Sequence, residues 1–128
     1  MSVCPIKILN GRKYQCFFEL AFLVIGGKWK PVILWHLSQE KALRFGELRR
    51  TIPEVTERML TKQLRELETD GLVHREVFRV VPPKVEYSLT EMGRSLIPIL
   101  EQMRDWGASY EEFLNGGEAL RGADSEKK

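Results

Sequence analysis

The sequence predicts a mainly α-helical domain with one small β-hairpin, an α+β fold. Its 128 residues are 43% hydrophobic and 30% charged, which is the size and composition of one globular domain. Through most of the chain, apolar residues recur at steps of three and four, as they do on the buried face of a helix. After Gly71 the step changes to two, which is typical of strands.

The first half of the chain is expected to form four helices. The first is apolar over a wide face, so we expect it to be mostly buried, and Gly26-Gly27 ends it. The third ends before Pro53, because the residue preceding a proline is pushed out of the α region. Thr56 is the expected N-cap of the fourth helix, and Gly71 ends it. The predicted ranges are Cys16–Ile25, Lys28–Leu37, Phe45–Thr51 and Thr56–Asp70.

The second half is expected to form a hairpin and a long terminal helix. Val73–Val81 and Lys84–Leu89 are rich in β-branched and aromatic residues, and two prolines separate them. Thr90 should cap the last helix, in which apolar residues recur as far as Phe113. Pro98 should bend or split this helix near its start.

The domain is expected to span residues 16–115, between an N-terminal arm at 1–15 and a disordered tail at 116–128. The longest apolar run has six residues, Leu20–Ile25, and no secretory signal is present, so we expect a cytoplasmic protein without membrane spans. Two cysteines without zinc-site spacing predict no disulfide scaffold, no metal and no cofactor.

Two short helices joined by a tight turn and followed by a hairpin form a winged helix-turn-helix, whose second helix enters the DNA major groove. On a helical wheel, donor side chains gather opposite the apolar side of the 56–70 helix. They can contact phosphates or base edges. The alternative is an ordinary solvated helix face. The clustered residues are Arg58, Thr61, Lys62, Arg65 and Thr69.

The charge distribution favours the DNA interpretation. Residues 1–65 carry twelve basic and five acidic side chains, whereas residues 66–128 carry eight and thirteen. Arg79 and Lys84 flank the hairpin tip, where they either reach the minor groove or protect an edge strand. The candidate DNA-binding residues are Arg49, Arg50, Thr56, Arg58, Thr61, Lys62, Arg65, Arg79 and Lys84.

Six segments have an order and spacing that are specific as a set. They are Ile25–Trp29, Arg44–Arg50, Met59–Leu67, Asp70–Val73, Val81–Thr90 and Gly93–Leu96. Through them, from Cys16 to about Trp106, the chain resembles the HxlR-type, MarR-like winged helix-turn-helix transcriptional regulators of bacteria. The resemblance implies homodimers that bind pseudo-palindromic operators in the nucleoid, with the terminal helices forming much of the dimer interface.

An apolar stripe on the terminal helix is the candidate dimer surface, because it is longer and more aromatic than one small domain needs. Its alternative role is ordinary core packing. The stripe comprises Leu96, Leu100, Met103, Trp106, Tyr110 and Phe113.

Cys16 is the candidate thiol sensor. In the HxlR-type regulators that the chain resembles, this position usually belongs to a Cys-Pro pair, but here Phe17 replaces the proline. Some members of that family use this cysteine to sense oxidants or electrophiles. Its place at a helix start, near Arg12 and Lys13, would favour a thiolate. The competing interpretation is inert packing against Phe17 and Phe18. Cys4 is an accessory candidate for pairing with it.

Enzyme activity is not expected, because His36 and His74 are isolated and no phosphate loop or nucleophile arrangement is present. Trp29, Trp35 and Trp106 are expected in the core, although a small effector site beside the dimer helices is a further candidate. The second function class is a winged-helix protein-interaction module without DNA binding. Steep salt dependence of duplex binding would separate the two classes.

Overall fold

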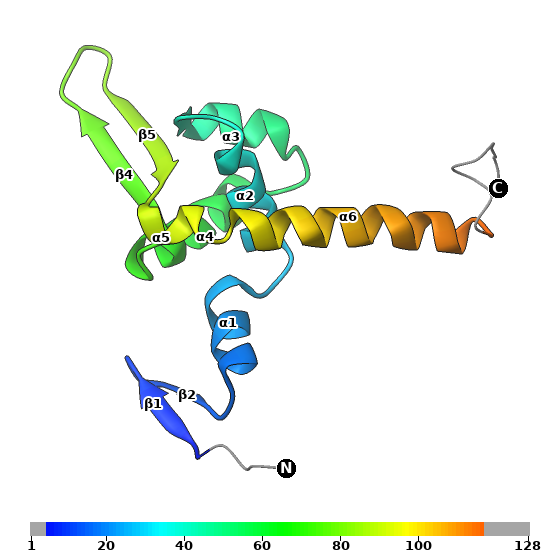
Figure 1. Cartoon of the computed structure of the whole chain (residues 1–128). Coiled ribbons are helices and arrows are strands. Elements are labelled where there is room, and N and C mark those ends of the chain that lie inside the picture. The colour runs from blue at the N-terminus through cyan, green and yellow to red at the C-terminus, as the bar shows by residue number, and fades with distance from the viewer. Residues whose placement is uncertain (1–4, 117–128) are drawn as a thin grey trace. The chain divides into compact units, whose positions relative to one another are not determined.

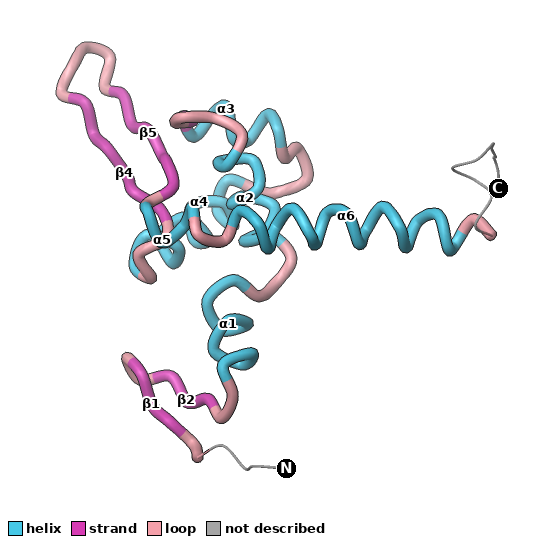
Figure 2. Tube along the Cα trace, in the orientation of Figure 1, coloured by secondary structure: helices cyan, strands magenta, loops and turns pink. Residues whose placement is uncertain are grey.

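The computed structural model describes residues 5–116, which fall into two compact units that meet in the sequence at Ser95 and Leu96. The first unit contains every described strand and the helices α1 to α5, and the second contains α6 (Figures 1 and 2). Cys4 and all but the first residue of the predicted tail lie outside the described residues. None of the described helices is long and apolar enough to cross a bilayer.

Four helices form where the sequence predicts them, within one residue at each end. Thr56 caps α4, since its hydroxyl accepts a hydrogen bond from the Met59 amide at 3.1 Å. Gly71 ends α4 with a φ of 83°, and the Leu72 amide donates to the Leu67 carbonyl at 2.9 Å, as in a Schellman motif. The observed helices are α1 (Phe17–Ile25), α2 (Trp29–Ser38), α3 (Phe45–Thr51) and α4 (Glu57–Thr69).

The predicted hairpin forms from β4 (Val73–Phe78) and β5 (Lys84–Leu89), with Val73 opposite Leu89. It projects away from the helices as a wing (Figure 1). A third strand, β3 (Leu43–Arg44), pairs with the other edge of β5 and completes an antiparallel sheet in the order β3-β5-β4. The sequence does not predict β3, because two residues are too few to show a period-two pattern.

The N-terminal arm is itself a hairpin, of β1 (Lys7–Leu9) and β2 (Arg12–Tyr14). Its turn residues Asn10 and Gly11 both have positive φ, 52° and 78°. Asn-Gly between short strands is the strongest short-range hairpin signal, so the dipeptide could have revealed this element.

The terminal helix splits as Pro98 predicts, into α5 (Glu91–Arg94) and α6 (Ile97–Leu114). The Thr90 hydroxyl caps α5 by accepting from the Gly93 amide at 3.1 Å. It also donates to the Gly71 carbonyl at 2.6 Å, which joins the start of α5 to the end of α4.

The core of the first unit lies between α2, α3, α4 and the start of the wing. Its apolar side chains are at most 4% exposed, so they carry most of the hydrophobic stabilisation. They are Ile33, Leu34, Leu37, Leu48, Ile52, Val55, Leu60, Leu64, Leu67, Leu72, Val73 and Leu89.

Helix α1 does not join this core, so the expectation of a mostly buried first helix is wrong for a single chain. Phe17, Phe18 and Phe22 are 73%, 72% and 62% exposed, and none of its residues is buried. Apolar periodicity predicts that one face of a helix is buried against other residues, but it does not say whether those residues belong to the same chain or to another chain.

Candidate nucleic-acid interface

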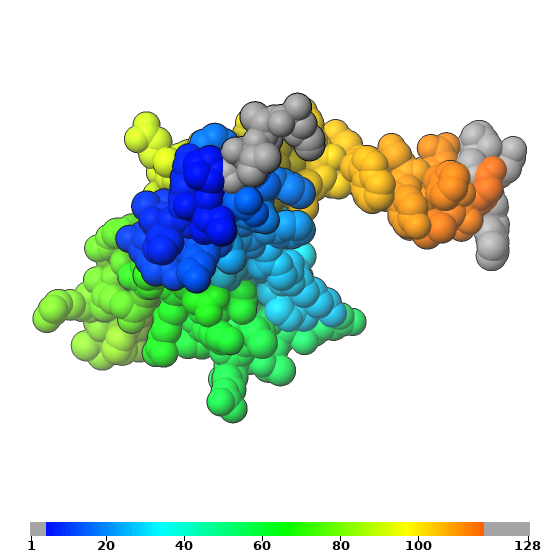
Figure 3. All heavy atoms as spheres, turned by 90° about the horizontal axis from the view of Figure 1, so that it is seen from below, coloured from blue at the N-terminus to red at the C-terminus, as the bar shows by residue number. Residues whose placement is uncertain are grey.

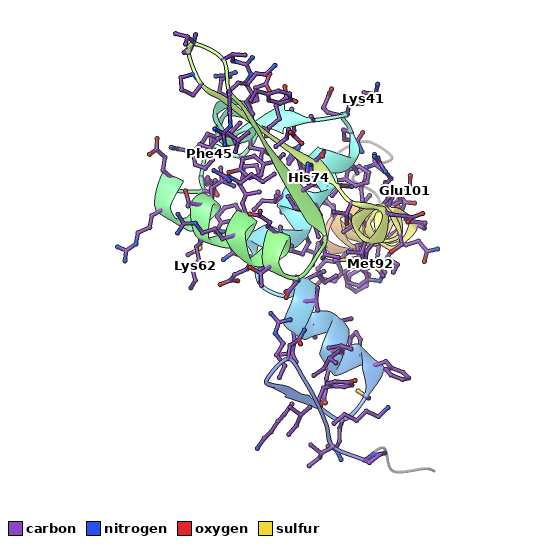
Figure 4. All side chains as sticks on the ribbon, turned by 90° about the vertical axis from the view of Figure 1, so that its left-hand side faces the viewer. Lys41, Phe45, Lys62, His74, Met92 and Glu101 are labelled. Atoms are coloured by element: carbon purple, nitrogen blue, oxygen red, sulfur yellow. The ribbon has the colours of Figure 1, made fainter. Side chains whose placement is uncertain are left out.

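Helix α4 separates an apolar side from a donor-rich side, as the helical wheel predicts. Leu60, Leu64 and Leu67 are at most 1% exposed. Arg58, Lys62, Arg65 and Thr69 are exposed, and Thr61 is half-buried. In Figure 4, Lys62 lies on the outer side of the helix. The helix therefore presents three cations to solvent from a backbone that its leucines hold in place.

An ion pair holds α4 against α2. The Lys30 ammonium on α2 lies 2.7 Å from Glu66 Oε1, and Lys30 is the one buried charged residue in the described part of the chain. Lys30 lowers the pKa of Glu66 through this hydrogen bond and through its charge, with smaller electrostatic contributions from Lys62 and Arg12, and these outweigh the effect of desolvation. The pair joins α4 to α2 through a residue that borders the exposed cations, since Glu66 lines the same surface as Arg58 and Lys62.

Both ends of α4 are also held by arginines. At its start, Arg49 Nη1 lies 3.3 Å from Glu57 Oε2, and the buried Arg49 Nε has no hydrogen-bond partner among residues 5–116. At its end, Arg12 Nη2 on β2 donates to Asp70 Oδ2 at 3.0 Å. Arg49 thus forms an ion pair within the chain, whereas Arg50 is exposed.

The wing tip combines one free cation with one that has internal partners. Arg79 is exposed, and Val81 is 99% exposed. Lys84 Nζ lies 4.4 Å from the centre of the Phe78 ring and 3.6 Å from Glu86 Oε2. Lys84 therefore has partners within the wing, whereas Arg79 is exposed at its tip.

Two surface hollows adjoin α4. One, of about 730 Å³, follows the helix, and its lining residues are Glu57, Arg58, Thr61, Lys62, Arg65 and Glu66. The other, of about 400 Å³, lies between α4 and the wing strands, and its lining residues are Thr61, Arg65, Glu68, Arg75 and Tyr87. Figure 3 shows the green surface around α4 next to the yellow-green wing.

Two residues that line the second hollow, Arg75 and Tyr87, are not among the candidates predicted from the sequence. They are cross-strand partners on β4 and β5, so their side chains project from the same face of the sheet. The position of Arg75 in the sequence could have indicated a special role. Arg75 falls in period-two register with Val73 and Val77, where an apolar residue is expected.

The predicted dimer stripe on α6 is mostly exposed. Leu100 is buried and Leu96 half-buried, but the rest are large apolar side chains open to solvent. The Trp106 and Tyr110 rings stack with centroids 5.1 Å apart, and Phe113 lies 5.8 Å from Tyr110. The exposed members are Met103 at 49%, Trp106 at 66%, Tyr110 at 43% and Phe113 at 71%.

Cys16 is an exposed free thiol at the N-terminal end of α1. The Glu19 carboxylate accepts hydrogen bonds from the Gln15 and Cys16 amides at 2.5 and 3.4 Å, which stabilises the first turn of the helix. Phe17 beside it faces solvent, with Lys7 Nζ 4.9 Å from its ring centre. The aromatic residues therefore leave Cys16 open rather than burying it.

Comparison with known families identifies the architecture. Residues 24–114 match the model of the HxlR-like helix-turn-helix family. The chain belongs to this family. It is 57% identical over 108 residues to the HTH-type transcriptional regulator YybR of Bacillus subtilis strain 168, an alignment that covers 84% of this chain and 86% of YybR. This HxlR-family chain is accordingly a helix-turn-helix transcriptional regulator with a winged-helix fold.

Solved structures of transcriptional and redox regulators agree with the fold. The chain is similar to the redox regulator HypR in its reduced form, with a TM-score of 0.74 and 54% identity over 79% of this chain and 99% of HypR. It is also similar to the reduced form of the transcriptional regulator YodB from Bacillus subtilis, with a TM-score of 0.63 and 36% identity over 73% of this chain and 91% of YodB.

Proposed function

We propose that this HxlR-family regulator binds operator DNA by placing α4 in the major groove. The observation that carries the proposal is the exposed donor face of α4 above a fully buried leucine side. Its 13 residues give a length of about 20 Å, enough to cross a groove about 12 Å wide. The residues nearest the bases are Arg58, Thr61, Lys62 and Arg65.

The remaining candidate cations position the protein on the DNA backbone. Arg50 and Arg79 are exposed and are available to phosphates. Arg49 and Lys84 contact phosphate by exchanging or sharing their acidic partners Glu57 and Glu86. The hydroxyl of Thr56 is engaged in the helix cap, so its contribution to DNA binding is to fix the start of α4.

The regulator acts as a homodimer on a pseudo-palindromic site. Exposed aromatic residues on α1 and on α6 support this, because monomeric proteins seldom leave such large apolar residues uncovered in groups. Twofold symmetry then places the two α4 helices on half-sites about one helical turn apart.

Replacement of Lys62 tests the groove assignment. Lys62→Ala should lose roughly 1 to 3 kcal/mol of operator affinity if the ammonium contacts a base, with relaxed preference at that position, or lower the salt slope by about one if it contacts phosphate. Lys41→Ala is the matched control, since Lys41 is also exposed and lies apart from α4 (Figure 4). If neither affinity nor salt slope changed in Lys62→Ala, the assignment would be refuted.

Thiol control through Cys16 is the second part of the proposal. Cys16 is exposed, and the similar protein HypR is a redox regulator. A mild oxidant should change the operator affinity of the parent protein, and Cys16→Ser should abolish that response without changing affinity under reducing conditions. An equal response in parent and Cys16→Ser would remove Cys16 from the proposal, and Ser95→Ala provides a control at another exposed position.

A further inference from the structure

The hollow between α4 and the wing has a composition suited to an anion. Arg65 and Arg75 contribute two guanidinium groups and Tyr87 a phenol, whereas Glu68 contributes the one carboxylate among its lining residues. Two elements build it, because Arg65 belongs to α4 while Arg75 and Tyr87 face each other across β4 and β5. None of the ion pairs described within residues 5–116 uses Arg65 or Arg75.

The geometry of duplex DNA determines which part of the nucleic acid would lie at the hollow between α4 and the wing. A winged helix-turn-helix places one element in the major groove and its wing at the adjacent minor groove. One sugar-phosphate backbone separates those two grooves, so this strand must run between the helix and the wing. Resting on the proposed binding mode, we infer that the 400 Å³ hollow seats a phosphate of this strand and that Arg75 is its principal ligand.

Each lining group has a defined part in this seat. Arg75 can hold both non-bridging oxygens of the phosphodiester with its planar guanidinium, and the Tyr87 hydroxyl can donate to one of the same two oxygens. Arg65 lines both hollows, so it stands between the phosphate and the base edges. Glu68 reduces the positive potential of the seat and thereby weakens DNA binding that does not depend on base sequence.

Variants of phosphate-binding residues and variants of base-reading residues should differ in how they change affinity for operator and for random-sequence DNA. Arg75→Ala should weaken binding to operator and random-sequence duplexes by the same factor, because phosphates carry no sequence information. Lys62→Ala should weaken binding to the operator more than binding to the random-sequence duplex, because Lys62 is one of the residues assigned to the base edges. Glu68→Gln should strengthen binding to both duplexes.

The salt dependence gives the size of the effect. Each phosphate contact contributes about 0.9 to the slope of log affinity against log salt. If Arg75→Ala loses one phosphate contact per protomer, its affinity should fall less steeply with salt than that of the parent. The affinity advantage of the parent over Arg75→Ala should therefore be roughly 3.5-fold smaller per protomer at 200 mM salt than at 50 mM salt. Arg94→Ala is the matched control, since Arg94 is exposed and lines neither hollow.

The deciding experiment is fluorescence anisotropy with a random-sequence duplex and a genomic operator fragment, at both salt concentrations, for the parent, Arg75→Ala, Arg75→Lys and Arg94→Ala. Thermal unfolding of each variant confirms that it is folded. The expected result is an equal loss on both duplexes with a reduced salt slope in Arg75→Ala, and partial recovery in Arg75→Lys. If the parent binds and Arg75→Ala matches it in affinity and slope, the phosphate seat is wrong while the proposed function stands. If the folded parent binds neither duplex at either salt, the proposed function fails, and the seat fails with it.

Discussion

Replacing Glu66 by glutamine should destabilise the protein more than any other single loss of charge on α4. Glutamine keeps the size of the side chain and an oxygen that accepts from Lys30, but it removes the negative charge 2.7 Å from that ammonium. The Lys30 side chain is 8% exposed and cannot gain full hydration in exchange. The variant therefore leaves a buried cation with a neutral partner.

The expected cost follows from the exposure of the two partners. Removing one member of a fully buried pair typically costs 3 to 5 kcal/mol. The Glu66 side chain is 40% exposed, so water screens part of the interaction and glutamine retains a hydrogen bond. We expect a loss of about 2 to 3 kcal/mol in the free energy of unfolding, measured by urea denaturation near neutral pH.

The pH dependence provides a second test with a defined sign. The pKa of Glu66 is lowered in the folded state from its ordinary value of 4.5, so its charge stabilises the fold above that value. This stabilisation is lost as pH falls through the lowered pKa. The difference between parent and Glu66→Gln should thus be constant near neutrality and shrink in acid.

Two further variants complete the test of the ion pair. Glu54→Gln, at an exposed position, should change stability by less than about 0.5 kcal/mol. The double variant Lys30→Met/Glu66→Met should recover most of the loss, because an apolar pair needs no counter-charge. A Glu66→Gln protein as stable as the parent at all pH values would refute the reasoning.

Three other expectations concern the caps, the core and the dimer. Thr56→Ala removes the α4 cap and should cost about 1 kcal/mol of unfolding free energy, whereas exposed Thr69→Ala should cost less. Gly93→Ala would place a methyl group in contact with the Leu72 carbonyl oxygen, and the displacement needed should cost about 1 to 3 kcal/mol in the same assay; no loss would show that α5 moves freely. Trp106→Ala should weaken self-association by about 30-fold in sedimentation equilibrium, a loss of about 2 kcal/mol, and unchanged association would remove α6 from the dimer surface.

Local chemistry explains why much of the fold could be predicted from the sequence. Pro53 ends α3 near Thr51 and Pro98 separates α5 from α6 through a backbone restriction, whereas Gly71 ends α4 because it can adopt a positive φ, and each effect acts over one or two residues. The donor face of α4 was predicted for the same reason, since it requires only the periodicity of one helix.

The β1–β2 hairpin had a local signal in Asn10-Gly11, but the other missed features depend on residues far apart in the chain or on a second chain. Lys30 and Glu66 are paired because α2 packs against α4, which no local pattern states. Arg75 reaches the α4 surface only through the register of β4 with β5. The exposure of α1 was missed because an apolar face requires a cover without specifying which chain provides it.

The central claim, that this HxlR-family chain is a dimeric operator-binding regulator, is tested most directly by selecting genomic DNA fragments with the purified protein at two salt concentrations. The account predicts enrichment of a pseudo-palindrome with half-sites about one helical turn apart, bound much more weakly at the higher salt. Failure to enrich any fragment at either salt concentration would contradict it. The chain would then be a winged-helix module for protein partners, with the exposed aromatic residues of α6 as the surface to examine.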